Sequence, residues 1–383
     1  DIDGNVSGDG FTVANHGVRV NDTVLLSSSN TVTKALVSAV NGAVISVKSY
    51  ETAVLADLST TTGATTLLVY GSEFKKGDTY GGSDARTANE PTFKSFTNKP
   101  IILKDYYEVS GSDASRIGWI EITSEEGQSG YMWYLKAESD TRSRFTDYLE
   151  MSMLESQVAA DASVVDTALA GAATATGTQG LFDAIEERGN ITSGISGVNA
   201  ATDLAEFDAI LAEFDKQGAI EENMMFVNRA TSLAMDDMLA SMNSYGAGGT
   251  SYGVFSNDED MALNLGFSGF RRGSYDFYKS DFRYLNDKAT RGGINATAGS
   301  AAIRGVIIPA GTSSVYDQNL GKNLTRPFLH VRYRASQTDD RKMKTWVTGS
   351  VGAATSSLDA MQLHFLSERC LITQGANNFM IMK

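Results

Sequence analysis

The side chains that most often carry catalytic or metal chemistry are few in this 383-residue sequence, and they lie far apart. The histidines are His16, His330 and His364, and the single cysteine is Cys370. No two histidines have the spacing of a metal pair on a helix, and there is no H-E-x-x-H motif. His330 lies in an alternating, strand-like segment, which favours a structural role. Cys370 lies in HFLSERCLITQ, which predicts a buried strand and a small core thiol in preference to a nucleophile.

Acidic residues are more abundant, but their pattern favours exposed surface over catalysis. Adjacent pairs such as Glu186 with Glu187 and Asp236 with Asp237 are typical of solvated helix faces, so we assign them no general acid or base role. No nucleophile elbow, Walker A loop or dinucleotide-binding glycine motif follows a predicted strand. The sequence therefore predicts a protein that is not an enzyme, with no catalytic, cofactor-binding or metal-binding residues.

The first ten residues, DIDGNVSGDG, resemble a calcium-binding loop. Asp1, Asp3 and Asn5 occupy the first ligand positions of such a loop. The glycine required at the sixth position is replaced by Val6, and the twelfth position is Thr12 where the motif needs glutamate. We therefore interpret this stretch as a polar arm. Because the sequence starts without methionine, we expect either a processed chain or numbering that begins inside a longer precursor.

Composition limits the classes of partner. The formal net charge is -14, with 42% hydrophobic residues, which fits one to three domains with a substantial core. Such an acidic chain is repelled by DNA phosphates on average, which argues against sequence-specific DNA binding. No apolar run approaches the ~18 residues of a membrane span. The segment RRGSYDFYK, residues 271–279, mixes basic and aromatic residues as single-strand binders do, but the acidic balance favours a surface loop contacting a neighbouring subunit.

The N-terminal part of the chain has the pattern of a small β module. In VNGAV, Asn41 and Gly42 separate two valine-bearing runs, and this dipeptide suits the tight turn of a hairpin. Another turn is predicted at Asn21 and Asp22, and the run TLLVYG closes the region, so four or five strands are expected by residue 72. Residues 73–92 are rich in glycine and polar, which predicts an exposed loop. Residues 93–111, FKSFTNKPIILKDYYEVSG, then predict a lysine-bearing extended segment.

Residues 129–160 give the strongest helix signal, with no proline and no glycine after the second position. The residues predicted to form its apolar face are Phe145, Tyr148, Leu149 and Met153. Glu138 with Arg142 and Asp140 with Arg144 are spaced for ion pairs along a solvated face. A helix of this length is expected to span much of a domain.

The middle of the chain alternates helix and strand. TDLAEFDAILAEFDKQG predicts a helix that starts near Asp203 and Glu206 and ends at Gly218. Its predicted apolar stripe is Leu204, Phe207, Ile210, Leu211 and Phe214. The run MMFV then predicts a buried strand, and Asn228 is expected to cap the following helix. This order indicates an α/β layer. Further strands are predicted at 305–309, 328–335 and 343–349, followed by two closing strands.

This order of elements resembles the major capsid proteins of tailed double-stranded DNA bacteriophages, which have the HK97-type capsid fold. FTNKPIILKDYYEVSGSD looks like the returning half of their extended loop, and YLKAESDTRSRFTDYLEMSMLES looks like their spine helix. GLFDAIEERGN together with DLAEFDAILAEFDKQGAIEENMMFVNRATSLAMDDM is similar to their axial domain. The small β module departs from the minimal fold and resembles an insertion into the extended loop.

The resemblance implies an α+β fold with four segments. They are an N-terminal arm and extended loop with the β module (1–110), a peripheral domain with the spine helix (111–175), an α/β axial domain (176–327), and closing strands returning to the peripheral domain (328–383). The implied function is self-assembly into the icosahedral shell of the virion that encloses the phage genome. The implied partners are copies of itself in pentamers and hexamers, and the portal, scaffold or decoration proteins of the virion. Packaged DNA would be contacted only non-specifically, and no membrane is involved.

Residues 73–110 are expected to form a two-stranded arm that lies on a neighbouring subunit. The lysines expected to contact that subunit are Lys75, Lys76, Lys94, Lys99 and Lys104. Some relatives crosslink lysine to asparagine between subunits, but simple ion pairing with acidic residues is the favoured role here. The main alternative function is a phage tail or bacterial surface-layer protein that forms tubes or sheets, and an enzyme is a distant third.

Overall fold

The computed structural model describes residues 17–28, 31–42, 44–51, 65–77, 96–115, 121–123, 129–161, 163–170, 176–243, 269–317, 322–350 and 355–383. The chain divides into an N-terminal unit, Asp1–Phe96, and a main unit, Thr97–Lys383. Helices and strands both contribute to the main unit, so the expected α+β class is confirmed.

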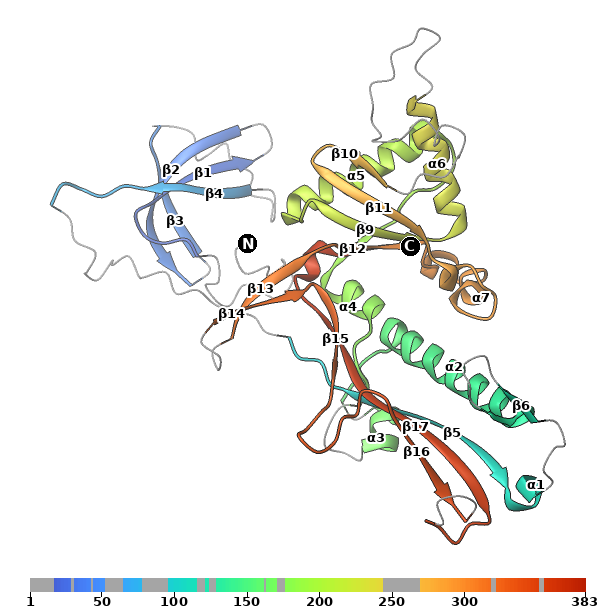
Figure 1. Ribbon diagram of the computed structural model, residues 1–383. Helices are drawn as coiled ribbons and strands as arrows, with labels where there is room; N and C mark the ends of the chain where they lie inside the picture. The colour runs from blue at the N-terminus through green and yellow to red at the C-terminus, as the bar shows by residue number, and fades with distance from the viewer. Residues whose placement is uncertain are drawn as a thin grey trace. The chain divides into compact units, whose positions relative to one another are not determined.

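The described part of the N-terminal unit is an antiparallel four-stranded sheet in the order β3-β2-β1-β4 (Figure 1). Its strands are β1 (Asp22–Ser28), β2 (Thr31–Asn41), β3 (Val44–Ser49) and β4 (Thr65–Ser72). Asn41 pairs with Val44 across the tight connection, and Gly42 has φ +59°, as the predicted turn requires. Asn21 also has positive φ, at 67°. The predicted β module and its turn at Asn21 are confirmed, and the hairpin turn begins at Gly42, one residue later than predicted, because Asn41 is the last paired residue of β2.

One long strand, β17 (Ala360–Thr373), organises the peripheral part of the main unit. Strand β5 (Ile101–Ser110) runs antiparallel along one of its edges. Strands β15 (Leu329–Tyr333) and β16 (Lys344–Gly349) follow one another along the opposite edge. The short elements nearby are α1 (Gly111–Ser115), β6 (Glu121–Thr123), β7 (Ser129–Tyr131) and α3 (Val164–Ala170).

The predicted long helix is α2 (Met132–Glu155), which packs on β5 and β17. Phe145 and Leu149 contact Leu363 and Phe365 in a buried cluster, as predicted. The prediction for Tyr148 is wrong, because its side chain is 48% exposed. A helix turns about 100° per residue, so the side chain of Tyr148 points about 100° away from that of Leu149 around the helix axis. Tyr148 therefore lies at the side of the buried stripe that Phe145 and Leu149 form.

The two predicted ion pairs of α2 have different outcomes. Arg142 and Glu138 lie 3.7 Å apart, as expected. Arg144 pairs with Asp105 of β5 at 2.9 Å, and no described contact joins it to Asp140. The helix is therefore anchored to the sheet by a charge pair as well as by its apolar face.

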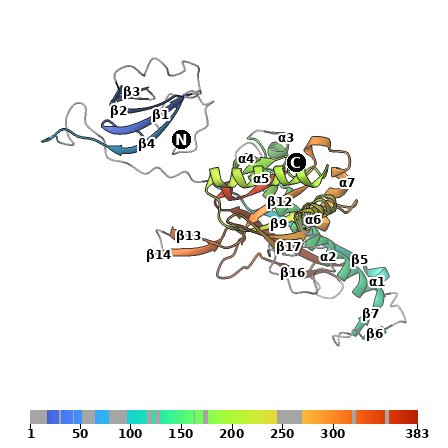
Figure 2. The ribbon, with the colours of Figure 1, turned by 90° about the horizontal axis from the view of Figure 1, so that it is seen from above.

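The axial part of the main unit is a six-stranded mixed sheet in the order β10-β11-β9-β12-β18-β8. The strands are β8 (Asn190–Thr192), β9 (Glu222–Val227), β10 (Gly269–Arg272), β11 (Tyr275–Asp281), β12 (Gly305–Pro309) and β18 (Met380–Met382). The helices and remaining elements are α4 (Leu181–Arg188), α5 (Ala200–Gln217), α6 (Arg229–Asn243), η3 (Arg283–Leu285), α7 (Arg291–Asn295), η4 (Gly299–Ala301), β13 (Thr312–Asp317), β14 (Lys322–Pro327) and η5 (Ala376–Asn378). The β13–β14 hairpin extends away from this sheet (Figures 1 and 2).

Both faces of the axial sheet are covered. On one face, α5 and α6 pack over the strands, with Phe207 and Phe214 against Phe277. On the other face, α4 packs through Phe182 and Ile185. Because successive side chains of a strand point to opposite faces, neighbouring residues of β12 and β18 enter different cores.

The caps of the axial helices partly follow the sequence pattern. Asn199, not Asp203, caps α5, since its side chain accepts a hydrogen bond from the Thr202 amide at 3.0 Å. Asp203 is buried and accepts from the Gly197 amide at 2.8 Å, so the predicted helix start is wrong by three residues. Gly218 ends α5 at φ 62°, as predicted. The predicted cap of α6 is also confirmed, because Asn228 accepts from the Thr231 amide at 2.8 Å.

Asn98 ties three segments together at the start of the main unit. Its amide nitrogen donates to the carbonyls of Gln179, at 2.9 Å, and Leu371, at 2.7 Å. Its amide oxygen accepts from the Gln179 amide at 2.8 Å and from the Thr178 hydroxyl at 3.0 Å. The side chain therefore joins the segment leading into β5 with the segment before α4 and with the end of β17.

Two of the expected segment assignments are wrong. Residues 101–110 do not form half of a free arm, because β5 pairs along its whole length with β17 of the same chain. Residues 328–383 do not all return to the peripheral part, because β18 pairs with β12 and β8 in the axial sheet. In both cases the partner strand is remote in sequence, and local patterns do not encode such pairings. Residues 78–95, the rest of the expected arm, lie outside the described residues.

Candidate assembly surface

The structure leaves the candidate chemical groups in separate places. Cys370 is buried on β17, and burial raises the pKa of its thiol, so the core-thiol interpretation fits. His330 lies 3.0 Å from the Pro327 carbonyl through its Nδ1 atom, in a local structural contact. Within the described residues, no group of three or more histidines, cysteines and acids could hold a metal ion. The calcium-like stretch and His16 lie outside those residues.

Three residues of the two acidic helix pairs, Glu186, Glu187 and Asp236, form ion pairs. Glu186 contacts Lys383 at 2.7 Å, and Glu187 lies 3.8 Å from Arg188. Asp236 pairs with Lys279, a contact whose two side chains are both largely buried. The contact of Glu186 connects α4 to the residue after β18, and the contact of Asp236 connects α6 to β11, which is a structural role. Among the helices that the structure describes, none is long and apolar enough to cross a membrane.

The basic and aromatic segment 271–279 is not the surface loop that its composition predicts. It forms β10, β11 and their connection, where Gly273 has φ +63°. Arg272 makes two contacts with Asp208, at 2.6 and 2.8 Å, and Arg271 lies 3.6 Å from Asp276. Carboxylates of the same chain therefore already neutralise these cations, which disfavours phosphate binding.

The peripheral sheet has a second face that points away from α2. Side chains alternate along a strand, so Leu103 of β5 faces the helix while Tyr106 faces the other way. On that outer face, Trp346, His364 and Tyr106 form a row across β16, β17 and β5. The ring centroids lie 5.1 Å apart between Trp346 and His364, and 6.1 Å apart between His364 and Tyr106. Such a row is a flat, partly apolar surface that another protein can cover.

Polar contacts hold the outer-face row in place. Gln362 donates to Glu108 at 2.6 Å, which links β17 to β5 next to the rings. Thr348 lies 2.7 Å from the Nε2 atom of His364 and so links β16 to the same position. The aromatic row is therefore a fixed surface of three paired strands.

The lysines expected to contact a neighbour are divided between the two units. Lys75 and Lys76 are exposed just after β4 in the N-terminal unit. Lys99 is exposed before β5, and Lys104 is exposed on β5, on the face with the aromatic row. Lys94 lies outside the described residues. The pattern that selected these residues was local, so it could not separate the two units.

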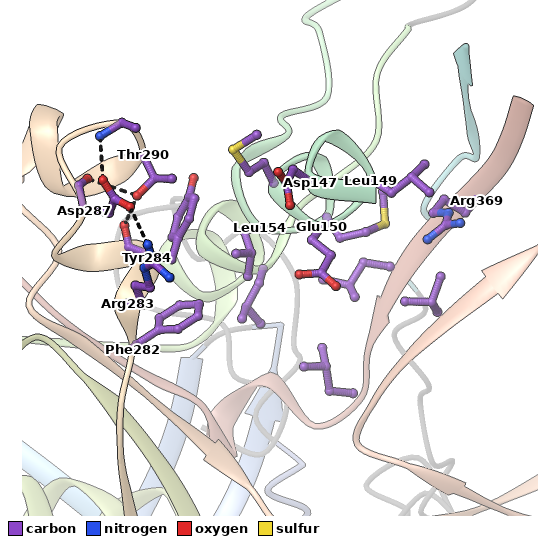
Figure 3. Close-up of a pocket in the computed structure, with 17 residues that line it drawn as sticks. Asp147, Leu149, Glu150, Leu154, Phe282, Arg283, Tyr284, Asp287, Thr290 and Arg369 are labelled. Carbon is purple, nitrogen blue, oxygen red and sulfur yellow. Dashed lines mark hydrogen bonds and ion pairs between the residues drawn. The ribbon is translucent and has the colours of Figure 1, made fainter. Parts of the chain in front are cut away.

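A groove of about 930 Å³ lies between α2, the strands β15 and β17, and residues 282–290, which include η3 and precede α7 (Figure 3). Asp147 and Glu150 of α2 line one side, and Arg283, paired with Asp287 at 3.5 Å, lines the other. The apolar part of the lining consists of Leu149, Met151, Met153, Leu154, Leu181, Phe282, Ala289, Leu329, Val331 and Leu371.

The end of α2 is attached to the far side of this groove. Glu155 accepts a hydrogen bond from the Tyr284 hydroxyl at 2.9 Å and pairs with Arg291. Burial, together with the Glu155 hydrogen bond, raises the pKa of Tyr284, so the phenol stays protonated. Arg291 also lies over the ring of Phe182, 5.9 Å from its centroid. These contacts attach the end of α2 to the segment that contains η3 and α7 and to α4.

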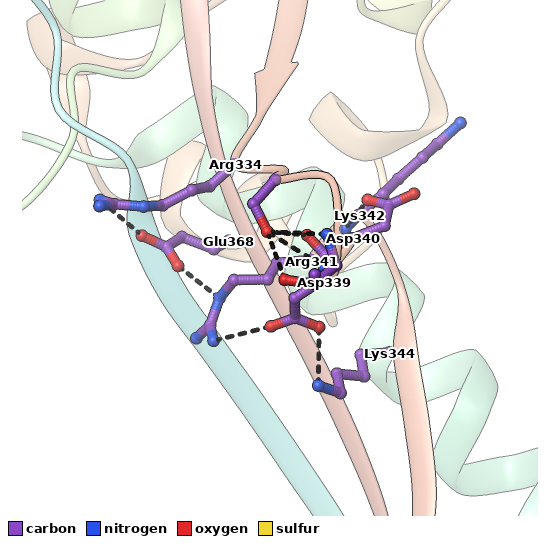
Figure 4. A network of polar contacts seen from close by, with 9 residues as sticks. Arg334, Asp339, Asp340, Arg341, Lys342, Lys344 and Glu368 are labelled. Carbon is purple, nitrogen blue, oxygen red and sulfur yellow. Dashed lines mark hydrogen bonds and ion pairs between the residues drawn. The ribbon is translucent and has the colours of Figure 1, made fainter.

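A charged turn joins β15 to β16 (Figure 4). Glu368 of β17 is largely buried and lies 2.6 Å from Arg341 and 3.5 Å from Arg334. Asp339 contacts Lys344 at 2.7 Å, and that hydrogen bond lowers the pKa of the Asp339 carboxyl. The two arginines lie on either side of the turn, and their contacts with Glu368 hold the turn against β17.

Large apolar side chains are exposed on many elements of both units. In the N-terminal unit they include Val32, Val44, Tyr50, Leu68, Val69, Tyr70 and Phe96. In the main unit they include Ile102, Tyr106, Tyr148, Val164, Val165, Leu169, Val198, Leu233, Tyr278 and Ile294. Single exposed apolar residues are ordinary, but a concentration of them marks surfaces that other proteins cover.

Comparisons with known proteins gave matches only among solved structures. No family model and no curated protein matches the sequence. The satellite phage P4 procapsid structure, which includes a size determination protein, matches with a TM-score of 0.36 and 11% identity, over 82% of this chain and 80% of that chain. The cyanophage Pam1 capsid matches with a TM-score of 0.38 and 13% identity, over 79% and 82%. A structure of Mycobacterium phage Ogopogo matches with a TM-score of 0.36 and 12% identity, over 80% and 82%.

Proposed function

We propose that this chain is an HK97-type major capsid protein whose copies assemble into the icosahedral shell of a phage virion. The observation that carries the proposal is the exposure of large apolar side chains on both units, while no group of three or more histidines, cysteines and acids among the described residues could hold a metal ion. A surface of this kind is stable when other subunits cover it. One chain can close into rings of five and six only through heterologous contacts, which need different patches on one subunit.

The arrangement of elements supports a shell over the alternative of a phage tail or surface-layer protein. The long helix α2 lies on a sheet made of β5, β15, β16 and β17, and a separate α/β layer follows. This order fits the spine helix, peripheral sheet and axial domain that the sequence resemblance implies, and so it supports the proposal. Proteins of tubes and sheets are more often built from repeated β domains.

The proposed domain division takes its boundaries from the strand pairings. An N-terminal unit (1–96) carries the β module. A peripheral domain combines 97–175 with 328–373, and an axial domain combines 176–327 with the last strand. The proposed partners are copies in pentamers and hexamers, with portal, scaffold or decoration proteins in the virion. Because the net charge is -14, contact with packaged DNA would be weak and non-specific.

Electron microscopy of the purified protein tests the proposed function. We expect closed polyhedral shells, or rings of five and six subunits, in negatively stained samples of the full chain. Tubes or flat sheets would support the tail or surface-layer alternative. Dispersed monomers at every protein and salt concentration would contradict assembly altogether.

We further propose that Lys75, Lys76 and Lys94 meet acidic residues of an adjacent subunit. Each exposed pair is worth only about 0.2–1 kcal/mol and is weakened by salt, but a shell repeats the contact in every subunit. Changing all three to glutamate should therefore abolish shells at low salt and partly restore them at high salt, where repulsion is screened. Sedimentation across salt concentrations measures this.

The matched control for this variant changes the same three lysines to arginine, which keeps the charge. We expect that control to assemble like the wild type. Normal sedimentation of the glutamate variant at every salt concentration would show that apolar packing and backbone pairing hold the subunits without these lysines.

A further inference from the structure

Strand β4 is an edge strand without the usual protection. It pairs with β1 on one side only, and within the described residues no strand lies along its outer edge. Its sequence, TTLLVYGS, contains no charged residue and no proline. The opposite edge strand, β3, carries Lys48. Exposed edges that remain unpaired usually carry a charge or a proline, because bare backbone groups recruit other strands.

Side chains of β4 are exposed on both faces of the sheet. Leu68 is 60% exposed and Tyr70 is 52% exposed, and Val69 between them is also exposed. Leu67 alone packs partly against the core of the unit. A strand in a finished sheet normally buries at least one face, so β4 has the exposure of a strand whose partner is another molecule.

The regular part of β4 is limited to Thr65–Val69. The register with β1 shifts after Val69, so Tyr70 has no partner residue on β1, and pairing resumes at Gly71. Such a bulge bends a strand and ends regular pairing on its outer edge. Five residues therefore remain for an added strand.

We propose that β4 pairs antiparallel with β4 of a second copy, across a two-fold axis centred on Leu67. This pairing, which rests on the proposed shell function, places Thr65 opposite Val69 and Thr66 opposite Leu68. Backbone hydrogen bonds supply the attraction, and the aliphatic and β-branched neighbours add cross-strand packing. The second copy is favoured as the occupant because a neutral strand meets an identical neutral strand without repulsion, although each whole chain carries a charge of -14.

The contact is suited to an assembly and not to a free dimer. Five paired residues bury far less than the roughly 1,200 Å² typical of a stable interface. Subunits that other contacts already hold side by side pair at a high effective concentration. The β4 contact is therefore expected in shells and absent from dispersed subunits.

Disulfide formation in the full chain tests the pairing. The double variant Thr66→Cys with Leu68→Cys puts two thiols on one face of β4, and pairing centred on Leu67 brings each beside its counterpart. The native Cys370 is buried and does not interfere. After mild oxidation of assembled particles, we expect most of the protein to run as a disulfide-linked dimer on a non-reducing gel. Dispersed subunits at the same concentration should stay monomeric.

The matched control is Val44→Cys with Ser46→Cys on the opposite edge strand, where Val44 is 66% exposed. It should give no dimer. A second variant, Leu68→Lys, should lower the yield of particles relative to Val44→Lys. Two results would overturn the pairing but not the shell function. One is normal particles with no disulfide-linked dimer of the β4 variant, and the other is equal amounts of dimer from the β4 and β3 variants. A wild-type chain that never forms particles would contradict both the β4 pairing and the proposed shell function.

Discussion

Replacing Phe145 by alanine is expected to lower the free energy of unfolding of the main unit by about 3–5 kcal/mol. The side chain is 1% exposed and packs between α2 and the central strand, with its ring 5.9 Å from that of Phe365. Its removal leaves a cavity that Leu149 and Leu363 can fill only partly, because both are held in the same cluster. The midpoint of urea unfolding measures the loss, and the yield of assembled particles should fall with it.

Tyr148→Ala is the matched control, since it removes a ring from the same helix at a position that is about half exposed. We expect a change within about 0.5 kcal/mol, typical of surface positions. Equal losses in the two variants would mean that general helix stability, and not the contact with β17, determines the result. An unchanged midpoint for Phe145→Ala would show that this face of α2 is not a core face.

The helix α2 shows which contacts a sequence pattern can predict and which it cannot. Apolar residues at three- and four-residue steps placed Phe145 and Leu149 correctly, because helical periodicity is a local property. The same pattern misassigned Tyr148, since the width of the buried stripe depends on what lies opposite. The same kind of pattern predicted a pair of Arg144 with Asp140, whereas Arg144 pairs with Asp105 of β5, 39 residues away in sequence.

Strand pairing limited the prediction of the fold. The turn that contains Gly42 and the cap at Asn228 depend on neighbouring residues and were predicted. The antiparallel register of β5 with β17 joins Ile101 to Arg369 and could not be predicted, because alternation shows which face a residue occupies but not which strand lies beside it.

Prediction of the candidate surface was limited by strand pairing in the same way. Alternation in β5 places Tyr106 and Lys104 on one face, although the local pattern of this segment also fits a free arm. The aromatic row needs Trp346 and His364 from two other strands, and only the register brings them together. The positive charges of Lys75 and Lys76 are visible in the sequence alone. The lack of charge in β4 indicates a contact surface only when the structure shows that β4 is an edge strand.

Asn98→Ala is expected to give the second large effect. The asparagine side chain makes two donated and two accepted hydrogen bonds to Thr178, Gln179 and Leu371, and Thr178 is fully buried. Each buried polar group left without a partner costs about 1–3 kcal/mol, so we expect a loss of about 3 kcal/mol or more. Because these bonds connect the segment before β5 with the end of β17, the loss should appear in the stability of the whole main unit. Urea unfolding measures it.

Two further variants separate this joint from an ordinary surface bond. Asn377→Ala removes an exposed bond to the Gln217 carbonyl and a 3.5 Å contact accepted from the Asn378 amide, and it should cost less than about 1 kcal/mol. Asn98→Asp keeps the size and the acceptor oxygen but turns a carboxylate toward the carbonyls of Gln179 and Leu371. That repulsion favours the protonated acid in the folded state, so its folded pKa lies above the unfolded value. Stability of this variant should therefore rise as pH falls through the folded pKa, since the folded state then binds more protons than the unfolded chain. An Asn98→Asp protein as stable as wild type at neutral pH would mean that the two donated bonds do not hold the segments together, and that backbone pairing of β5 with β17 suffices.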